Sequence, residues 1–550
     1  MSARGRPRSL RLRHVCPSRW QQRRLLNHFI SKAPEPTDEP TPAFSFTLAV
    51  KDNIATTTPP ASTPTTTPTT TPTPPPPSPP PLPTTCASPF LAAYHSPFEA
   101  TIVTQLRARG ARLVGKTNLD EFGMGSHSTF SAAGAAAQTP AAGAAAGTQD
   151  PAVRLSAGGS SGGSAVAVAD GAADVALGTD TGGSVRLPAA YCGVVGFKPS
   201  YGMLSRFGVV PYANSLDTVG LLARGVGRIR ELVVGPGGLW SEHDARDPTS
   251  LSEAARRRCA RGREGYAAGR AGEGPVGGVL RGVRFGMPLE YNIAELDPRI
   301  RDAWAATAKR LQDEFGARVV PVSLPTTRHA LAAYYVIAPA EASSNLAKYD
   351  GVRYGARDED AASDAAGGVL YAGSRGRGFG DEVKRRILLG SYTLSSEAMD
   401  NYFIQAQRVR RLVRRDFNRV FALDNPLHER ETFELSELDE SIAMEDKWGP
   451  EEVDFLLCPT APTLAPKLER VLNQTPVDAY MNDVFTVPAS LAGLPAISIP
   501  MPVASNAAGA MPEGPGTAGL QLIGQYWDDA RLLSVAGAVS KTLQAADPGR

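Results

Sequence analysis

The chain has 550 residues, a formal net charge of +2 and five scattered cysteines without a CxxC pair. Length alone predicts two to four domains, although a large α/β fold can form one unit. The near-neutral charge argues against general nucleic-acid or membrane binding, no apolar run approaches the ~18 residues of a membrane helix, and the cysteine pattern favours a reducing compartment.

Residues 1–33 have the composition of a targeting segment. They contain eight arginines between Arg4 and Arg24, several serines, and no Asp or Glu precedes Glu35. This composition is typical of a mitochondrial transit peptide, and the absence of an apolar h-region argues against a secretory signal. We therefore expect a protein of the mitochondrial matrix, with a disordered basic tail as the alternative interpretation of this segment.

The segment Phe44–Ile54, FSFTLAVKDNI, predicts a buried strand that carries Lys51 at its end. Residues 56–85 are mostly Pro and Thr, a composition that excludes helix and sheet and predicts a disordered, solvated insert. We expect further surface inserts at 254–278, rich in Arg and Gly, and at 424–450, rich in carboxylates. Apart from these inserts, residues 34–545 are predicted to form a single domain.

The segment Gly110–Thr117, GARLVGKT, formally matches the phosphate-loop pattern GxxxxGK[ST]. In a phosphate loop the four intervening residues wrap a phosphate, whereas Ala-Arg-Leu-Val is typical of a strand. The preceding apolar residues Ile102, Val103 and Leu106 indicate an amphipathic helix that ends near Gly110. We therefore predict a helix followed by a strand at 111–114, and no nucleotide site.

The rest of the chain alternates between helical patterns and short apolar runs. Helices are predicted at 164–169, 297–315, 330–349, 381–420 and 528–543, and strands at 172–177, 453–458, 496–500 and 519–524. This alternation indicates an α/β fold. The seven histidines are scattered without metal-ligand spacing, so no metal site is expected.

Two Gly/Ser clusters, GGSSGG at 158–163 and TDTGGS at 179–184, lie within the stretch Ala157–Ser184. Glycine leaves backbone N–H groups accessible to a bound atom, and serine supplies hydroxyls that can attack. A simple core element would not need this composition, because it costs conformational entropy on folding. The stretch is therefore the predicted active site.

A serine nucleophile in these clusters needs a base. No histidine lies in or near them and there is no GxSxG elbow, which disfavours a Ser-His-Asp triad. A buried lysine with a lowered pKa is the other solution, and Lys51 is the natural candidate. The residues alone leave this open, because Lys51 could equally pair with Asp52.

Lys51, GGSSGG and TDTGGS, in this order, resemble the amidase signature family, which uses a Ser–cis-Ser–Lys triad. The resemblance implies a central mixed β-sheet covered by helices on both faces. It places the nucleophile at Ser184, the bridging serine at Ser160 after a cis peptide bond, and the base at Lys51. It also assigns the oxyanion hole to the backbone N–H groups of Thr181, Gly182, Gly183 and Ser184.

Further blocks between about residues 44 and 540, among them NLDEFGMGS, SLDTVG and DVFTVPASLAGLPAISIP, are similar to one branch of this family. That branch comprises the glutaminase (A) subunits of glutamyl-tRNA(Gln) amidotransferases, carbon–nitrogen ligases with glutamine as amido donor. The resemblance implies that Tyr334, Arg386 and Asp483 hold free glutamine. It also implies that a partner B subunit uses the released ammonia, with ATP and Mg²⁺, to convert Glu-tRNA(Gln) into Gln-tRNA(Gln).

The same resemblance implies no cofactor on this chain, a small third subunit, and tRNA contacts made mainly by the B subunit. Two alternatives stay open: a stand-alone amidase that acts on another small or acyl amide, and a catalytically silent scaffold within such a complex. The chain departs from the family pattern in the Pro/Thr insert directly after Lys51 and in the Ala/Gly-rich sequence before GGSSGG. The second departure bears on substrate access and partner docking.

Overall fold

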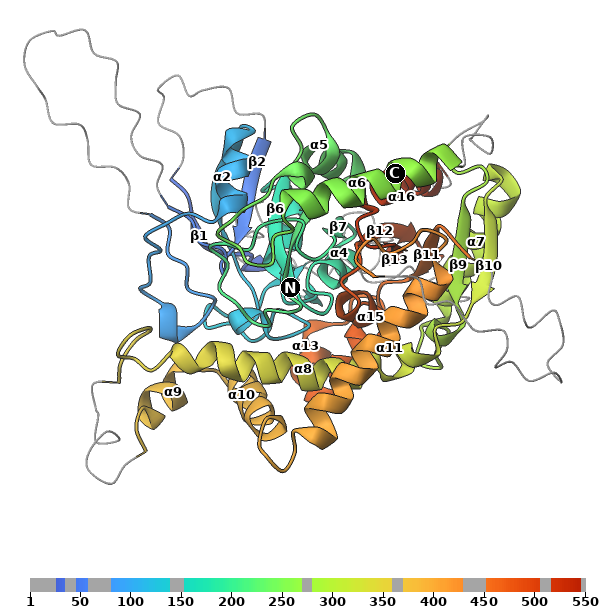
Figure 1. The fold of residues 1–550 in the computed structure, drawn as a ribbon. Coiled ribbons are helices and arrows are strands. Elements are labelled where there is room, and N and C mark those ends of the chain that lie inside the picture. Colours follow the sequence, from blue (N-terminus) through green and yellow to red (C-terminus); the bar gives the residue numbers. More distant parts are fainter. Residues whose placement is uncertain are drawn as a thin grey trace, which may run out of the picture.

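The computed structural model describes residues 26–34, 46–57, 81–138, 153–269, 279–358, 369–428, 452–504 and 516–545. Its centre is one 11-stranded sheet with the order β1-β3-β2-β6-β8-β7-β12-β13-β11-β9-β10 (Figure 1). Most of the predicted transit peptide, of the Pro/Thr insert and of the acidic insert lies outside the described residues, so these assignments stay predictions.

The strands of the large sheet are short and mostly buried. They are β1 (Phe29–Lys32), β2 (Phe46–Lys51), β3 (Ala111–Thr117), β6 (Val175–Asp180), β7 (Val195–Lys198), β8 (Thr218–Ala223), β9 (Arg284–Pro288), β10 (Arg318–Val322), β11 (Phe455–Pro459), β12 (Ala496–Pro502) and β13 (Thr517–Gly524). Parallel pairs join β2 to β3 and β6, and β9 to β10 and β11, whereas the middle of the sheet is antiparallel. The predicted mixed sheet is confirmed.

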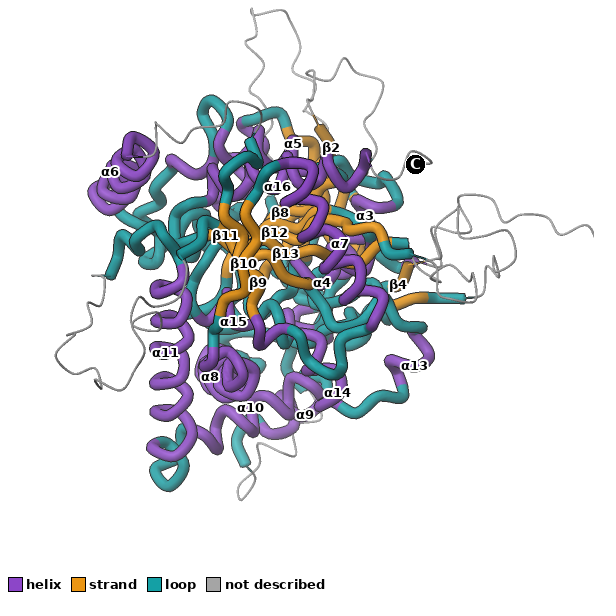
Figure 2. Tube along the Cα trace, turned by 90° about the vertical axis from the view of Figure 1, so that its right-hand side faces the viewer, coloured by secondary structure: helices purple, strands orange, loops and turns teal. Residues whose placement is uncertain are grey.

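Helices cover both faces of this sheet. On β2 the side chains of Leu48 and Val50 join one core cluster, whereas Ala49 joins a second cluster on the opposite face, as the period of two requires. Helices α2 (Thr101–Ala108), α5 (Val226–Val234) and α16 (Asp529–Ala545) pack on the first face, and α3 (Gly162–Ala169) and α4 (Arg186–Cys192) pack on the second. Figure 2 shows the helices arranged around the strands of the sheet. The α/β architecture predicted from the sequence is therefore confirmed.

A group of helices lies at one end of the sheet (Figure 1). It comprises α8 (Ala330–Asn345), α9 (Ala372–Gly378), α10 (Asp381–Thr393) and α11 (Gln405–Val420), and α8 packs against both α10 and α11. Small segments α13 (Leu468–Leu472), α14 (Pro476–Tyr480) and α15 (Val487–Leu491) lie between β11 and β12 in the chain, and α15 packs on α8 and α11. Helix α7 (Pro298–Phe315) covers β10 and β11. A two-stranded sheet, β4 (Ala137–Gln138) with β5 (Leu155–Ser156), precedes α3.

Several predicted boundaries shift in the structure. The strand expected at 172–177 is Val175–Asp180, and the helical pattern over 381–420 is divided into α10 and α11. Residues 254–269 of the predicted insert 254–278 belong to helix α6 (Glu253–Gly269), whose Cys259 is fully buried. Gly110–Thr117 contains strand β3 rather than a phosphate loop, as predicted. Among the helices in the described ranges, none combines the length and apolar composition needed to cross a lipid bilayer.

Candidate active site

Lys51 ends strand β2 in the middle of the parallel part of the sheet and is fully buried. Its Nζ donates to Ser160 Oγ at 2.7 Å and to Thr179 Oγ1 at 2.9 Å. The pairing of Lys51 with Asp52, left open by the sequence, does not occur. Asp52 instead forms an ion pair with Lys116 at 3.1 Å, so Lys51 has no carboxylate in direct contact among the described residues.

The environment of Lys51 favours the neutral amine. Burial lowers the pKa of Lys51 to about 7, and the more distant charges of Asp120, Asp180 and Asp217 only partly oppose this shift. The uncharged amine is therefore accessible to Lys51 near neutral pH, unlike an ordinary lysine. An uncharged amine next to a serine hydroxyl can act as a general base.

Ser160 lies in the turn between β5 and α3, and the Gly159–Ser160 peptide bond is cis, as the family resemblance implies. Ser160 is buried, and its carbonyl accepts from the backbone N–H of Asp120 at 3.3 Å. A Cβ on Gly159 would lie 2.3 Å from Asp120 Oδ2, so only glycine fits there. The serine hydroxyl is thus held against Lys51 by the fold around it.

Ser184 lies in the turn from β6 to α4 and is partly exposed, unlike Ser160. The two Gly/Ser clusters meet, because the backbone N–H of Ser161 donates to the carbonyl of Ser184 at 3.1 Å. In the described residues the Ser184 hydroxyl has no hydrogen-bond partner, so its contact with Ser160 during catalysis stays a prediction.

The backbone from Thr181 to Gly183 is fixed from both sides. Thr486 Oγ1 donates to the Gly182 carbonyl at 2.6 Å, and Thr181 Oγ1 donates to Asp217 at 2.7 Å. A Cβ on Gly183 would lie 2.2 Å from Thr486 Oγ1, and a Cβ on Gly182 would lie 2.6 Å from the Tyr334 ring. Glycine is therefore required at both positions. A turn held in this way can serve as an oxyanion hole, because preorganised N–H donors need no rearrangement during reaction.

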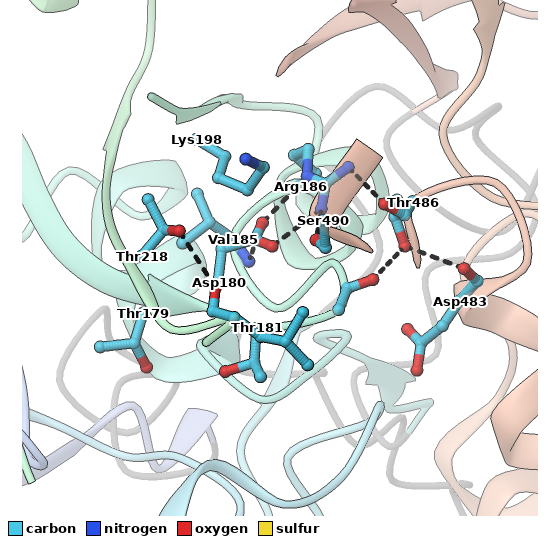
Figure 3. A network of polar contacts seen from close by, with 12 residues as sticks. Thr179, Asp180, Thr181, Val185, Arg186, Lys198, Thr218, Asp483, Thr486 and Ser490 are labelled. Carbon is cyan, nitrogen blue, oxygen red and sulfur yellow. Dashed lines mark hydrogen bonds and ion pairs between the residues drawn. The ribbon is translucent and has the colours of Figure 1, made fainter. Parts of the chain in front are cut away.

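Arg186 anchors this turn (Figure 3). Its guanidinium is fully buried and makes two hydrogen bonds to Asp180, at 2.8 and 3.0 Å. It also donates to the Thr486 carbonyl, Gln521 Oε1 and Ser490 Oγ. Burial alone would raise the pKa of Asp180, but the charge and hydrogen bonds of Arg186 keep it below its usual value. The ion pair fixes both ends of the segment that contains Ser184.

We expect Arg186→Met to lower the free energy of unfolding by about 3–5 kcal/mol, because it leaves the buried Asp180 carboxylate without its partner. Urea unfolding followed by fluorescence measures the change. The matched control is Arg257→Met, which removes an exposed ion pair with Glu253 on helix α6 and should change stability by less than about 1 kcal/mol. Equal effects of the two substitutions would contradict this role for Arg186.

The three residues predicted to hold glutamine gather around Tyr335. Asp483, buried after α14, accepts from the Tyr335 hydroxyl at 3.0 Å and from Ser126 Oγ at 2.9 Å. Burial raises the pKa of Asp483 to about 7, although these two hydrogen bonds lower it. Tyr334 contacts Tyr335 edge-on, with ring centroids 5.0 Å apart, and borders Gly182. Tyr334 therefore links this group of residues to the glycine turn.

Arg386, on α10, reaches the same place from the helical layer. Its guanidinium lies 5.4 Å from the Tyr335 ring centroid, and it donates to Glu382 Oε1 and to the Tyr212 hydroxyl. The structure thus brings the predicted site residues together in two neighbouring groups. One group is Tyr334, Arg386 and Asp483. The other is Lys51 at the end of β2, with Ser160 and Ser184 in the two Gly/Ser turns. In the described part of the chain no group of three His, Cys, Asp or Glu side chains could hold a metal ion.

Tyr335, Thr486 and Ser126 orient the predicted site residues but were not predicted from the sequence. Tyr335 follows Tyr334 directly, so the pair Tyr-Tyr could have drawn attention to both. Thr486 and Ser126 lie more than 300 residues apart from Gly182 and Asp483, their respective partners, and no local pattern signals either contact.

This chain is similar to known proteins in sequence and in fold. The profile of the Amidase family matches residues 81–533. The chain is 67% identical over 554 aligned residues to the mitochondrial glutamyl-tRNA(Gln) amidotransferase A subunit of Podospora anserina, covering 99% of this chain and 100% of the relative. The protein of the same name from Neurospora crassa is 62% identical, with 99% of each chain covered. Among solved structures, the A subunit of Thermotoga maritima glutamyl-tRNA(Gln) amidotransferase matches with a TM-score of 0.63 and 31% identity, over 95% of this chain and 90% of that chain.

Proposed function

This chain belongs to the amidase family, and we propose that it is the glutamine-hydrolysing A subunit of a mitochondrial glutamyl-tRNA(Gln) amidotransferase. The observation that carries the proposal is the hydrogen bond between buried Lys51 and Ser160. Near this pair, Arg386 and Asp483 both contact Tyr335, whose neighbour Tyr334 borders the glycine turn. The first group supplies amide-cleaving chemistry. The second supplies an arginine and a carboxylate of the kind that recognise the carboxylate and ammonium of a free amino acid.

In the proposed reaction, Ser184 Oγ attacks the side-chain amide carbon of glutamine. Its proton passes to Ser160 Oγ, while the Ser160 proton passes to the uncharged Nζ of Lys51. The backbone N–H groups of residues 181–184 hold the oxyanion, at roughly 3–4 kcal/mol per donor.

The carbon–nitrogen bond then breaks, and the relay returns the proton so that ammonia leaves. A γ-glutamyl ester remains on Ser184. Water attacks this ester with the same relay as base, which releases glutamate and restores the serine. Glutamine and water are thus converted into glutamate and ammonia.

The chain works as one part of a multi-subunit amidotransferase, because its close relatives are named as A subunits of such an enzyme. We propose that a B subunit receives the ammonia and uses ATP and Mg²⁺ to amidate Glu-tRNA(Gln), and that a small third subunit completes the complex. Most contacts with the tRNA would then belong to the B subunit, in keeping with the net charge of +2 on this chain.

The proposal is tested with the purified complex and with this chain alone. Glutamine hydrolysis should be coupled to the formation of Gln-tRNA(Gln) and should increase when Glu-tRNA(Gln) and the B subunit are present. A chain that hydrolyses varied amides without partners and ignores glutamine would instead be the stand-alone amidase considered above.

We expect Asp483→Asn to raise the KM for glutamine by about 10- to 100-fold, because the α-ammonium loses a charged acceptor worth about 1.5–3 kcal/mol. Amidation with added ammonium chloride should be unchanged, since it bypasses this pocket. Glu469→Gln is a matched control on the exposed surface of α13. An unchanged KM in Asp483→Asn would contradict the assignment of this carboxylate to the α-ammonium.

A further inference from the structure

His127 is a buried histidine that the proposed reaction does not use. Its side chain is 2% exposed, and both ring nitrogens have partners. Nδ1 lies 2.8 Å from Ser156 Oγ, and Nε2 lies 3.1 Å from Asn482 Nδ2. The ring also stacks on Tyr191, with centroids 6.3 Å apart and an interplanar angle of 22°.

The neighbours of His127 determine its tautomer. The Tyr191 hydroxyl donates to Asn482 Oδ1 at 2.9 Å, so the amide nitrogen of Asn482 faces the ring. That nitrogen has hydrogens to give, one to the Ala479 carbonyl and one to His127 Nε2. Nε2 therefore accepts, and Nδ1 carries the proton and donates to Ser156. Burial lowers the pKa of His127 to about 4, which keeps the ring neutral at physiological pH.

On one side, two hydrogen bonds join the segment of Ser126 and His127 to the segment of Asn482 and Asp483. Ser126 Oγ donates to the Asp483 carboxylate, and the next residue, His127, accepts from Asn482, the residue before Asp483. Two neighbouring side chains of one segment thus hold two neighbouring side chains of the other. Ser126 and Tyr335 hold the Asp483 carboxylate itself, whereas the His127–Asn482 contact fixes the segment that carries it.

On the other side, His127 reaches the segment that leads to Ser160. Ser156 Oγ, which accepts from His127, also accepts from the backbone N–H of Gly158 at 3.1 Å. Gly158 is two residues before Ser160 in the GGSSGG turn. A chain of short polar contacts therefore runs from the carboxylate of Asp483, through the two segments and His127, to the turn of the relay serine.

We propose that His127 is a positioning residue that holds the glutamine-binding carboxylate of Asp483 at a fixed distance from the turn of Ser160. This inference rests on the proposed glutaminase function, because only there do the two groups act on one substrate. The ammonium and the reacting amide lie at opposite ends of glutamine, so both ends must be placed together for attack. Small errors in such placement reduce rates strongly.

The test compares two substitutions in the complete complex. His127→Phe keeps the size of the ring and its stacking on Tyr191 but removes both hydrogen bonds. We expect the KM for glutamine to rise about 10-fold and kcat to fall several-fold. His127→Gln carries a donor and an acceptor on one amide, as the imidazole does, and should keep both constants within about threefold of wild type.

Amidation with ammonium chloride should be the same in wild type and both variants, which separates positioning from general damage to the complex. A wild-type KM in His127→Phe, or equal losses in the Phe and Gln variants, would overturn the inference. If His127→Phe does not fold, Tyr191→Phe removes the hydroxyl that orients Asn482 and should also raise the KM for glutamine. Absence of glutamine hydrolysis in the wild-type complex would overturn the proposed function instead.

Discussion

Replacement of Ser184 by alanine should reduce glutamine-dependent amidation by about 10⁴-fold or more, while amidation with added ammonium stays at the wild-type level. The first part follows because no ester can form without the nucleophile. The second follows because free ammonia enters the reaction after the step that Ser184 performs. Parallel assays of the complex with glutamine and with ammonium chloride measure both. Ser391→Ala, on the exposed side of α10, is the matched control.

The same assay tests the relay through Ser160. Ser160→Ala should lose about 10³-fold or more, and the double variant should lose no more than Ser184→Ala alone, because groups that act as one unit are not additive. The stability of Ser184→Ala should match wild type, since this hydroxyl is partly exposed and has no partner among the described residues. Glutamine-dependent activity that survives in Ser184→Ala would show that another residue is the nucleophile.

The sequence predicted those helices and strands that are determined by residues close together in the chain. The apolar run FTLAVK forms β2, and the pattern over 297–315 forms α7, which begins at Pro298 after the N-cap Asp297. Helix α8 extends through Pro339, as its pattern suggested. These segments were predictable because a period of two or 3.6 residues is a local property of the chain.

Contacts across the sheet could not be predicted in this way. Whether Lys51 pairs with Asp52 depends on where Lys116 lies, and that is set by the parallel pairing of β2 with β3. No feature of AVKDN indicates that Lys51 and Asp52 contact different partners, Ser160 and Lys116 respectively. The family resemblance supplied the role of Lys51, and the packing of β3 explains physically why that lysine keeps no counter-ion in contact.

The walls of the site depend on still more distant contacts. Thr486 supports Gly182, and Ser126 and Tyr335 orient Asp483. Each of these pairs is separated by more than 140 residues, and each consists of common residue types. Their role becomes visible only once the helical layer packs against the end of the sheet. The transit peptide and the inserts at 56–85 and 424–450 stay predictions, because they lie mostly outside the described residues.

The second large effect concerns Lys51 and pH. The turnover number kcat with glutamine should rise about tenfold per pH unit below about 7 and level off above it, because only the uncharged amine can accept the Ser160 proton. The sign follows from burial, which lowers the pKa of Lys51 to about 7, so acid converts the base into an ammonium that cannot act. Lys51→Met should reduce kcat by about 10³- to 10⁴-fold across this range.

The ratio kcat/KM should fall more steeply than kcat below pH 7. It reports the free protein, in which Asp483 must also lose its proton, and burial raises the pKa of that carboxyl to about 7. Once glutamine is bound, its ammonium favours the ionised Asp483 carboxylate, so the pH dependence of kcat no longer reflects this ionisation. Asp483→Asn should therefore lose the extra slope in kcat/KM and keep the slope that Lys51 produces.

The pH dependence of the unfolding free energy tests the ionisation of Lys51 separately from that of the other buried groups. In the unfolded chain lysine keeps its proton up to about pH 10.5, whereas in the folded protein Lys51 loses it near pH 7. The unfolded state therefore binds more protons between these values, and the Lys51 contribution makes the folded protein more stable as pH rises through them. The difference in unfolding free energy between wild type and Lys51→Met should follow this trend. A difference independent of pH, together with a kcat that is flat between pH 6 and 8, would mean that Lys51 remains charged and that the base is another group.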